Sequence, residues 1–261
     1  MRHRKSAIAA LPSGLCRIGG VCMSQWLLIR HGQASFMSDD YDRLSELGVE
    51  QGRALGRWWV THNVRPTHVF TGNLQRQRHT AAAVGTMFAQ AQLDFPQPVQ
   101  LAGLNEYDAD ALIRDLAPAL AEVDDEIAVL QRAFTSASEQ HEQYKAVHRL
   151  LEASMLRWIG DAPQVREVGM ASWSEFSDGV RAAMQQTRVS QSGATVAVFT
   201  SGGPIGVAVQ TALRAPQVVA AELNWRVMNA AVTQFTYSGD RLALDTFNTT
   251  PFLGADELTY R

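Results

Sequence analysis

The feature that most constrains this chain is a short apolar run that ends in an arginine, a histidine and a glycine. Residues 26–29 read Trp-Leu-Leu-Ile, which is typical of a short buried strand. Arg30 can grip phosphate oxygens through its planar fork, and His31 is a nitrogen nucleophile near neutral pH. Gly32 lets the backbone turn closely beside a bound anion. This order suits phosphate chemistry, while a core strand capped by a surface Arg-His pair is the plainer interpretation.

Strand and helix patterns alternate over the first hundred residues. Ser45 is placed to cap a helix that runs to about residue 62, and residues 67–71 form a second short strand. Asn73 is expected to cap the next helix, which ends near residue 90, and residues 99–101 follow as a third strand. This alternation predicts an α/β fold, a three-layer sandwich with a mainly parallel sheet.

The middle of the chain changes character. Apolar and aromatic residues from 127 to 158 recur at spacings of three and four, which is typical of one long helix or of two helices broken near residues 135–138. We therefore expect an all-helical insertion at about residues 109–167. His141 and His148 lie on this stripe, but no third ligand stands at a standard spacing for a metal. Partly buried or interface histidines are therefore the favoured interpretation.

The last third returns to sheet patterns. Residues 172–188 form an amphipathic helix, and residues 195–200 read as a buried strand. Ser201, Gly202 and Gly203 follow that strand, and Pro204 is placed to start a helix that runs to about residue 214. Two further apolar runs flank a Ser-Gly-Asp turn at residues 238–240, which predicts a C-terminal hairpin that closes the sheet.

Charge and cysteine usage limit the setting of the protein. The formal net charge of −3 at pH 7 argues against general nucleic-acid or membrane binding, and no apolar run reaches the roughly 20 residues of a membrane span. The cysteines are Cys16 and Cys22, whose spacing fits no common zinc or redox motif, so a reducing cytoplasm is the expected location. Residues 1–22 are interpreted as a flexible N-terminal extension, and residues 23–261 as a single domain.

Residues suited to phosphate chemistry follow several of the predicted strands. In a parallel sheet, ligands bind beyond the carboxyl ends of the strands. The first strand delivers Arg30 and His31, and the second leads to Arg76 in the first turn of its helix. The strand before residues 201–203 delivers free backbone N–H groups that favour an anion. The loop after the third strand adds Glu106, so a nucleophile, two guanidiniums, an anion cradle and a carboxylic acid converge.

Several motifs in the same order resemble the histidine phosphatase superfamily, in its phosphoglycerate-mutase-like branch. Arg30-His31-Gly32 resembles the hallmark at the end of the family's first strand. Residues 44–52 (LSELGVEQG) are similar to its helix opening L-T-x-x-G-x-x-Q-A, and residues 69–81 (VFTGNLQRQRHTA) to its segment V-x-S-S-x-L-x-R-A-x-Q-T-A. The resemblance covers about residues 23–248 and is loosest over the insertion.

The resemblance implies a role for each site residue. His31 would be the nucleophile that takes the phosphoryl group, and Arg30 and Arg76 would bind its oxygens. These two cations would also keep His31 neutral by disfavouring its protonation. Glu106 would donate a proton to the leaving group and then act as base when water hydrolyses the phosphohistidine, with Asp108 as an alternative donor.

The chain departs from the family after residues 195–200. Family members usually carry Ser-His-Gly-Gly there, whereas this chain has Thr-Ser-Gly-Gly, so that Ser201 stands at the position of the second histidine. A hydroxyl donates one hydrogen bond but carries no positive charge, and by analogy the loss costs about 3 kcal/mol of transition-state stabilisation. Ser201 and Gly202 are nevertheless expected to bind phosphate, helped by the helix dipole. His79, one turn after Arg76, is a less favoured replacement.

These features predict a metal-independent phosphomonoester hydrolase that needs no cofactor and acts on a small phosphorylated substrate through His31. A catalytically weak phospho-ligand-binding or regulatory protein is the alternative, because of Ser201. A phosphoglycerate-type mutase is less favoured, since Phe36-Met37 stand where mutases of the family have Trp-Asn. No nucleic-acid or membrane partner is expected. The physiological substrate and the pairing of two copies into a homodimer are left open.

Overall fold

A computed structural model describes residues 17–18, 21–34 and 42–260. The chain divides into two compact units, the first made of Met1–Gln100, Thr187–Phe199 and Met228–Arg261, the second of Leu101–Gln186 and Thr200–Val227. The predicted extension, residues 1–22, lies outside the described residues except for two short strands. These are β1 (Arg17–Ile18) and β2 (Val21–Cys22), which pair antiparallel.

The first unit is built on a mixed sheet, which has six strands in the described part of the chain, in the order β5-β4-β6-β3-β7-β8. Its strands are β3 (Ser24–Arg30), β4 (His68–Thr71), β5 (Val99–Gln100), β6 (Thr195–Thr200), β7 (Val232–Ser238) and β8 (Arg241–Thr249). β4 pairs parallel with β5 and β6, whereas β7 pairs antiparallel with β3 and β8. The predicted α/β fold and C-terminal hairpin are confirmed.

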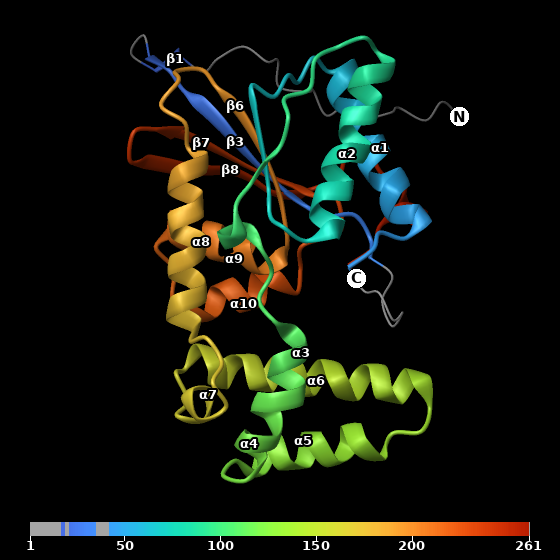
Figure 1. The fold of residues 1–261 in the computed structure, drawn as a ribbon, viewed down its shortest axis with the longest axis vertical. Helices are drawn as coiled ribbons and strands as arrows, with labels where there is room; N and C mark the ends of the chain where they lie inside the picture. The colour runs from blue at the N-terminus through green and yellow to red at the C-terminus, as the bar shows by residue number, and fades with distance from the viewer. Residues whose placement is uncertain (1–16, 19–20, 35–41, 261) are drawn as a thin grey trace, which may run out of the picture. The chain divides into compact units, whose positions relative to one another are not determined.

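Two helices of the first unit, α1 (Glu46–Thr61) and α2 (Gln75–Gln90), pack side by side (Figure 1). As predicted, Ser45 caps α1, because its hydroxyl oxygen accepts a hydrogen bond from the Gly48 backbone N–H at 3.0 Å. The two helices and the sheet share one apolar core, which buries alternate residues of β3. Its members include Leu27, Ile29, Leu55, Trp59, Val84, Phe88 and Phe199.

The second unit is helical. Its elements are α3 (Ala109–Ala111), the π-helix η2 (Leu112–Leu116), α4 (Ala117–Ala121), α5 (Asp125–Ser136), α6 (Gln140–Ile159), α7 (Gln164–Glu167), α8 (Trp173–Thr187), α9 (Gly202–Leu213) and α10 (Val218–Asn224). α5 and α6 pack side by side (Figure 1). In the sequence they are joined by residues 137–139, close to the predicted break. Among its described residues, the predicted insertion therefore consists of helices joined by short turns and contains no strand.

The apolar stripe of the insertion is buried only near its ends. Ile127 and Trp158 are buried, whereas His141 and Tyr144 near the start of α6 are exposed. The Tyr144 ring lies 4.3 Å from that of half-buried His148, measured between centroids. Within the described residues, no group of three or more His, Cys, Asp or Glu side chains is placed to hold a metal ion.

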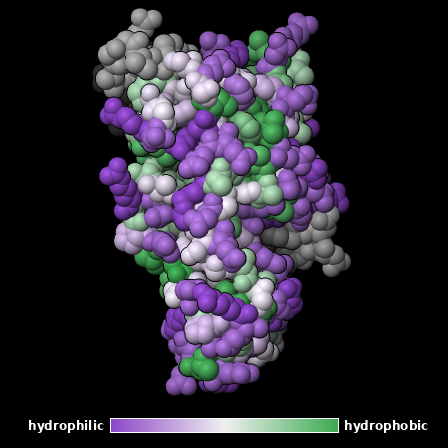
Figure 2. All heavy atoms as spheres, turned by 60° about the vertical axis from the view of Figure 1, so that its left-hand side comes forward, coloured by the Kyte–Doolittle hydropathy of each residue, from purple (hydrophilic) through white to green (hydrophobic). Residues whose placement is uncertain are grey.

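Hydrophilic side chains dominate the face drawn in Figure 2, and apolar residues appear there in small separate groups. Large apolar side chains that are exposed include Val123 and Val129, both in the helical insertion. Among residues 17–18, 21–34 and 42–260, no helix has the length and apolar character needed to cross a membrane.

Candidate active site

The end of β3 is fixed on both sides of His31. The Arg30 backbone N–H donates to the Ala231 carbonyl at 3.1 Å. The His31 carbonyl accepts from the Ala230 backbone N–H and from the buried Asn229 side-chain amide, each at 3.2 Å. Because these bonds tie the backbone to the segment before β7, the imidazole leaves the sheet in one direction.

Position 32 requires glycine because the loop after His31 passes very close to the first turn of α1. A Cβ atom at this position would overlap the backbone carbonyl of Gly48 in the first turn of α1. The loop after His31 is further joined to this helix start, because the Ser45 N–H donates to the Gln33 carbonyl at 2.9 Å. Glycine is therefore required here for packing, a reason that the sequence alone did not supply.

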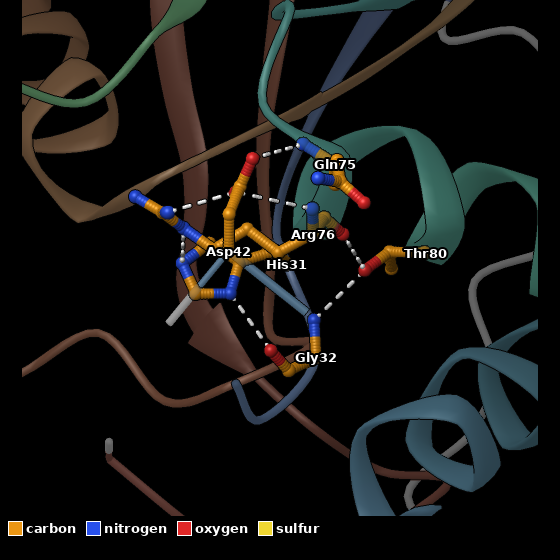
Figure 3. Close-up of polar contacts among 6 residues, drawn as sticks. All are labelled: His31, Gly32, Asp42, Gln75, Arg76 and Thr80. Carbon is orange, nitrogen blue, oxygen red and sulfur yellow. Dashed lines mark hydrogen bonds and ion pairs between the residues drawn. The ribbon is translucent and has the colours of Figure 1, made fainter. Parts of the chain in front are cut away.

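The hydrogen bonds of His31 fix its tautomer (Figure 3). Its Nδ1 lies 2.7 Å from the Gly32 carbonyl oxygen, which can only accept, so Nδ1 carries the proton. Its Nε2 lies 3.2 Å from Nε of Arg76, which can only donate, so Nε2 presents its lone pair. The ring is thus a neutral imidazole whose Nε2 is the nucleophilic atom.

The surroundings of His31 oppose its protonation. The side chain is 3% exposed, and its neighbours Arg30 and Arg76 are each 7% exposed. Burial, followed by the charges of Arg76 and then Arg30, holds the pKa of His31 well below its ordinary value, although the bond to Gly32 acts in the opposite direction. The predicted effect of the two cations is present, and burial adds a larger one.

Arg76 is held in place by Asp42, a residue that the sequence analysis did not single out. Asp42 Oδ1 accepts from Nη1 of Arg76 at 3.0 Å, while Oδ2 accepts from the Gln75 backbone N–H at 2.7 Å.

The prediction that Asn73 caps α2 is wrong. The helix begins at Gln75, which makes Leu74 the N-cap residue, and a leucine side chain has no acceptor. Asp42 supplies the missing acceptor.

Thr80 couples the loop after His31 to α2. Its hydroxyl donates to the Arg76 carbonyl at 2.7 Å and accepts from the Gly32 N–H at 2.9 Å (Figure 3). The side chain is fully buried. This one hydroxyl therefore fixes the spacing between the loop after His31 and the helix that carries Arg76.

Arg30 is anchored by the C-terminal segment of the chain. Its Nη1 donates to the Tyr260 backbone carbonyl at 2.7 Å. That segment is held by the fully buried side chain of Gln51, whose Nε2 donates to the Glu257 carbonyl at 2.8 Å and to Thr259 Oγ1 at 2.9 Å. Gln51 Oε1 also accepts from the Gln33 N–H at 2.8 Å, so one amide joins the C-terminus to the loop after His31.

The remaining predicted site residues form a second group, which belongs to the second unit. The Glu106 carboxylate accepts from the Gly203 N–H at the start of α9, with oxygens at 3.0 and 3.2 Å. A Cβ at Gly203 would overlap this carboxylate, so the approach requires glycine. Ser201 is the N-cap residue of α9 and is fully buried, but the Ser201 side chain does not cap the helix. Gly202 is buried as well.

The structure therefore gathers Arg30, His31 and Arg76 in the first unit, and Glu106 with residues 201–203 in the second. His79 is exposed on α2. The residues missed by sequence reasoning are the supporting ones: Asp42, Gln51, Thr80, Asn229 and Tyr260. Gln51 and Thr80 did leave a signal, because both stand at lettered positions of the two motifs that resemble the family, although the motifs alone gave them no role.

Known proteins are similar to this chain in sequence. The sequence model of the histidine phosphatase superfamily (branch 1) matches residues 26–149 and 135–250. A curated relative, the 2,3-bisphosphoglycerate-dependent phosphoglycerate mutase of Methylorubrum extorquens (strain PA1), is 31% identical over 88 residues. That match covers 31% of this chain and 40% of the mutase, so the chain spans well under two thirds of the curated relative's length.

Solved structures are similar in fold. Phosphoglycerate mutase from Bacillus anthracis str. Sterne has a TM-score of 0.58 and 17% identity, over 88% of this chain and 95% of that one. Mycobacterial glucosyl-3-phosphoglycerate phosphatase has a TM-score of 0.54 and 20% identity, over 87% and 99% of the two chains. The TM-scores show a similar fold, and at identities this low they do not show that the reaction is shared.

Proposed function

The chain belongs to the histidine phosphatase superfamily (branch 1), and on that premise we propose that it is a phosphomonoester hydrolase acting through a phosphohistidine on His31. The superfamily contains both phosphatases and mutases, so membership alone leaves the reaction open. The observation that carries the proposal is the state of His31, a buried neutral imidazole whose Nε2 lone pair points at a guanidinium. A phosphohistidine can form only on an unprotonated ring nitrogen, because the lone pair of that nitrogen makes the bond to phosphorus.

The first step transfers the phosphoryl group. Nε2 of His31 attacks phosphorus, the bond between phosphorus and the ester oxygen breaks, and Glu106 protonates the departing alkoxide. Arg76 now donates to Nε2, so its N–H must turn to a phosphoryl oxygen as the new bond forms. Arg30 and Arg76 stabilise the charge on the equatorial oxygens, which is the main demand of phosphoryl transfer.

The second step releases phosphate. Glu106, now ionised, takes a proton from water, the water oxygen attacks phosphorus, and the bond to Nε2 breaks, returning neutral His31 and inorganic phosphate. The position of Glu106 against the first turn of α9 supports this assignment, because Ser201 and Gly202 begin the same helix. Their backbone N–H groups would bind phosphoryl oxygens where family members use a histidine.

We propose further that the reaction needs no metal ion or cofactor. The charge stabilisation that a divalent cation gives other phosphatases is assigned here to the two buried guanidiniums. Small phosphorylated molecules are the substrate class, and the helical insertion is the region expected to select among them. Incubation with EDTA should leave turnover unchanged, and a strict Mg²⁺ requirement would contradict the mechanism.

Turnover of p-nitrophenyl phosphate tests the proposal. The wild-type protein should hydrolyse the ester, His31→Ala should be inactive, and Glu106→Gln should lose activity most strongly on esters with poor leaving groups. Ser201→His should raise the rate by up to about two orders of magnitude, because it restores a positively charged donor. Full activity in His31→Ala would refute the mechanism.

Two alternatives have specific support. The curated relative is named as a mutase, and a mutase should interconvert 2- and 3-phosphoglycerate when primed with 2,3-bisphosphoglycerate. Residues 36–37, whose identity disfavours that activity, lie outside the described residues. Ser201 supports a weakly catalytic phospho-ligand-binding protein instead. That alternative predicts phosphate binding by a silent wild-type protein, with activity gained in Ser201→His.

A further inference from the structure

Asp42 makes the contacts that a bound phosphate would make. Its two oxygens accept from the Gln75 N–H at 2.7 Å, the Arg76 N–H at 3.4 Å and the Arg76 guanidinium at 3.0 Å. The first two donors are at the N-terminus of α2, a sixteen-residue helix whose dipole favours an anion. The third is a buried cation that also donates to the nucleophilic nitrogen of His31.

From this geometry we propose that Asp42 is the counter-ion of Arg76 when the phosphate site is empty. Asp42 releases the guanidinium when a phosphate group binds, and it competes with inorganic phosphate for Arg76 when the product leaves. The inference rests on the proposed function, because it assumes that phosphate binds at Arg76 beside His31. Nη1 of Arg76 cannot serve Asp42 and a phosphoryl oxygen equally well, so binding of one weakens binding of the other.

A purely structural role would explain only part of this arrangement. Capping of α2 accounts for the bonds to the two backbone N–H groups. Capping does not require an ion pair with Arg76, whose side chain is 8% exposed and donates a hydrogen bond to His31. The Asp42 side chain is 28% exposed, so solvent can receive the carboxylate when it leaves Arg76.

The charges set the sign and size of the effect. Arg30 and Arg76 place two positive charges beside His31, and the Asp42 carboxylate cancels one of them. Removing the negative charge leaves a stronger field for a phosphate dianion at a site only partly screened by water. We expect inorganic phosphate to bind about tenfold more tightly to Asp42→Asn than to the wild-type protein.

Calorimetric titration with inorganic phosphate at neutral pH tests this in the full chain. The series comprises the wild-type protein, Asp42→Asn, Asp42→Ala and the control Asp94→Asn, which removes one negative charge from an exposed position after α2. Both Asp42 variants should bind phosphate more tightly and also melt at a lower temperature, because the cap of α2 is weakened. Asp94→Asn should match the wild-type protein in both measurements.

Opposite changes in phosphate affinity and melting temperature are the signature of a counter-ion, since loss of a structural cap alone would weaken both. Equal or weaker phosphate binding by Asp42→Asn would overturn the inference. If the wild-type protein hydrolyses p-nitrophenyl phosphate in that case, the proposed function survives. If no variant binds phosphate and the wild-type protein is also inactive toward the ester, both proposals fail together.

Discussion

At the scale of single residues, the proposed chemistry depends on the protonation state of His31. An exposed histidine would be partly protonated near neutral pH, and a protonated ring has no lone pair for phosphorus. Here burial and two guanidiniums favour the neutral form, and two hydrogen bonds place the remaining proton on Nδ1. The tripeptide Arg30-His31-Gly32 pointed to this chemistry, whereas the tautomer follows from partners that only the structure identifies.

The lowered pKa of His31 predicts a pH dependence of stability. Below about pH 6.5 the unfolded chain protonates this histidine while the folded protein keeps it neutral, so the unfolded state binds more protons. The free energy of unfolding should therefore fall with decreasing pH, by up to about 1.4 kcal/mol per pH unit from this group. Above pH 6.5 its contribution is constant. Urea unfolding across this range should show a shallower dependence for His31→Asn, and equal slopes would contradict the account.

Thr80 offers a second test at this scale. Thr80→Val keeps the shape of the side chain but leaves the buried Gly32 N–H without its acceptor. We expect a loss of about 2 kcal/mol in the free energy of unfolding, together with lower turnover. Thr86→Val is the matched control, because Thr86 lies on the same helix and makes the same type of bond to the carbonyl four residues before it, but is exposed. It should change stability by less than about 0.5 kcal/mol.

At the scale of elements, periodicity predicted most helices and strands, and the exceptions have physical causes. The hairpin, the buried strand before Ser201 and the break between α5 and α6 carry clear patterns of apolar and turn residues. The C-terminal segment carries none, because it is held by side chains of distant residues such as Gln51 and not by a pattern of its own. Its role at Arg30 was invisible in the sequence for that reason.

The C-terminal segment should be needed for activity through its backbone. Deleting residues 259–261 removes the carbonyl that anchors Arg30 and the hydroxyl that bonds to Gln51. We expect kcat/KM for p-nitrophenyl phosphate to fall at least about tenfold, because the guanidinium that we propose binds phosphate loses its fixed position. Tyr260→Ala retains the carbonyl and changes only a side chain that is 55% exposed, so it should keep near wild-type kinetics. Equal losses in both variants would argue against anchoring by the backbone.

At the scale of the whole molecule, the predicted site residues fall into two groups carried by the two compact units. Motif order identified the members of each group, namely His31 with its two arginines and Glu106 with the turn that begins at Ser201. The contacts of most supporting residues could not be predicted from the sequence, because the partners lie far apart in the chain. Asp42 to Arg76 and Arg30 to Tyr260 are two such contacts.

We propose that His31 carries the phosphoryl group during turnover. The most direct test mixes the wild-type protein with p-nitrophenyl phosphate that carries radioactive phosphorus. The reaction is then quenched rapidly under alkaline conditions that preserve phosphohistidine, and the peptides are mapped. We expect transient label on the peptide that contains His31, attached at Nε2, and no label in His31→Ala. Steady turnover with no label on that peptide, or label on any other residue, would contradict it.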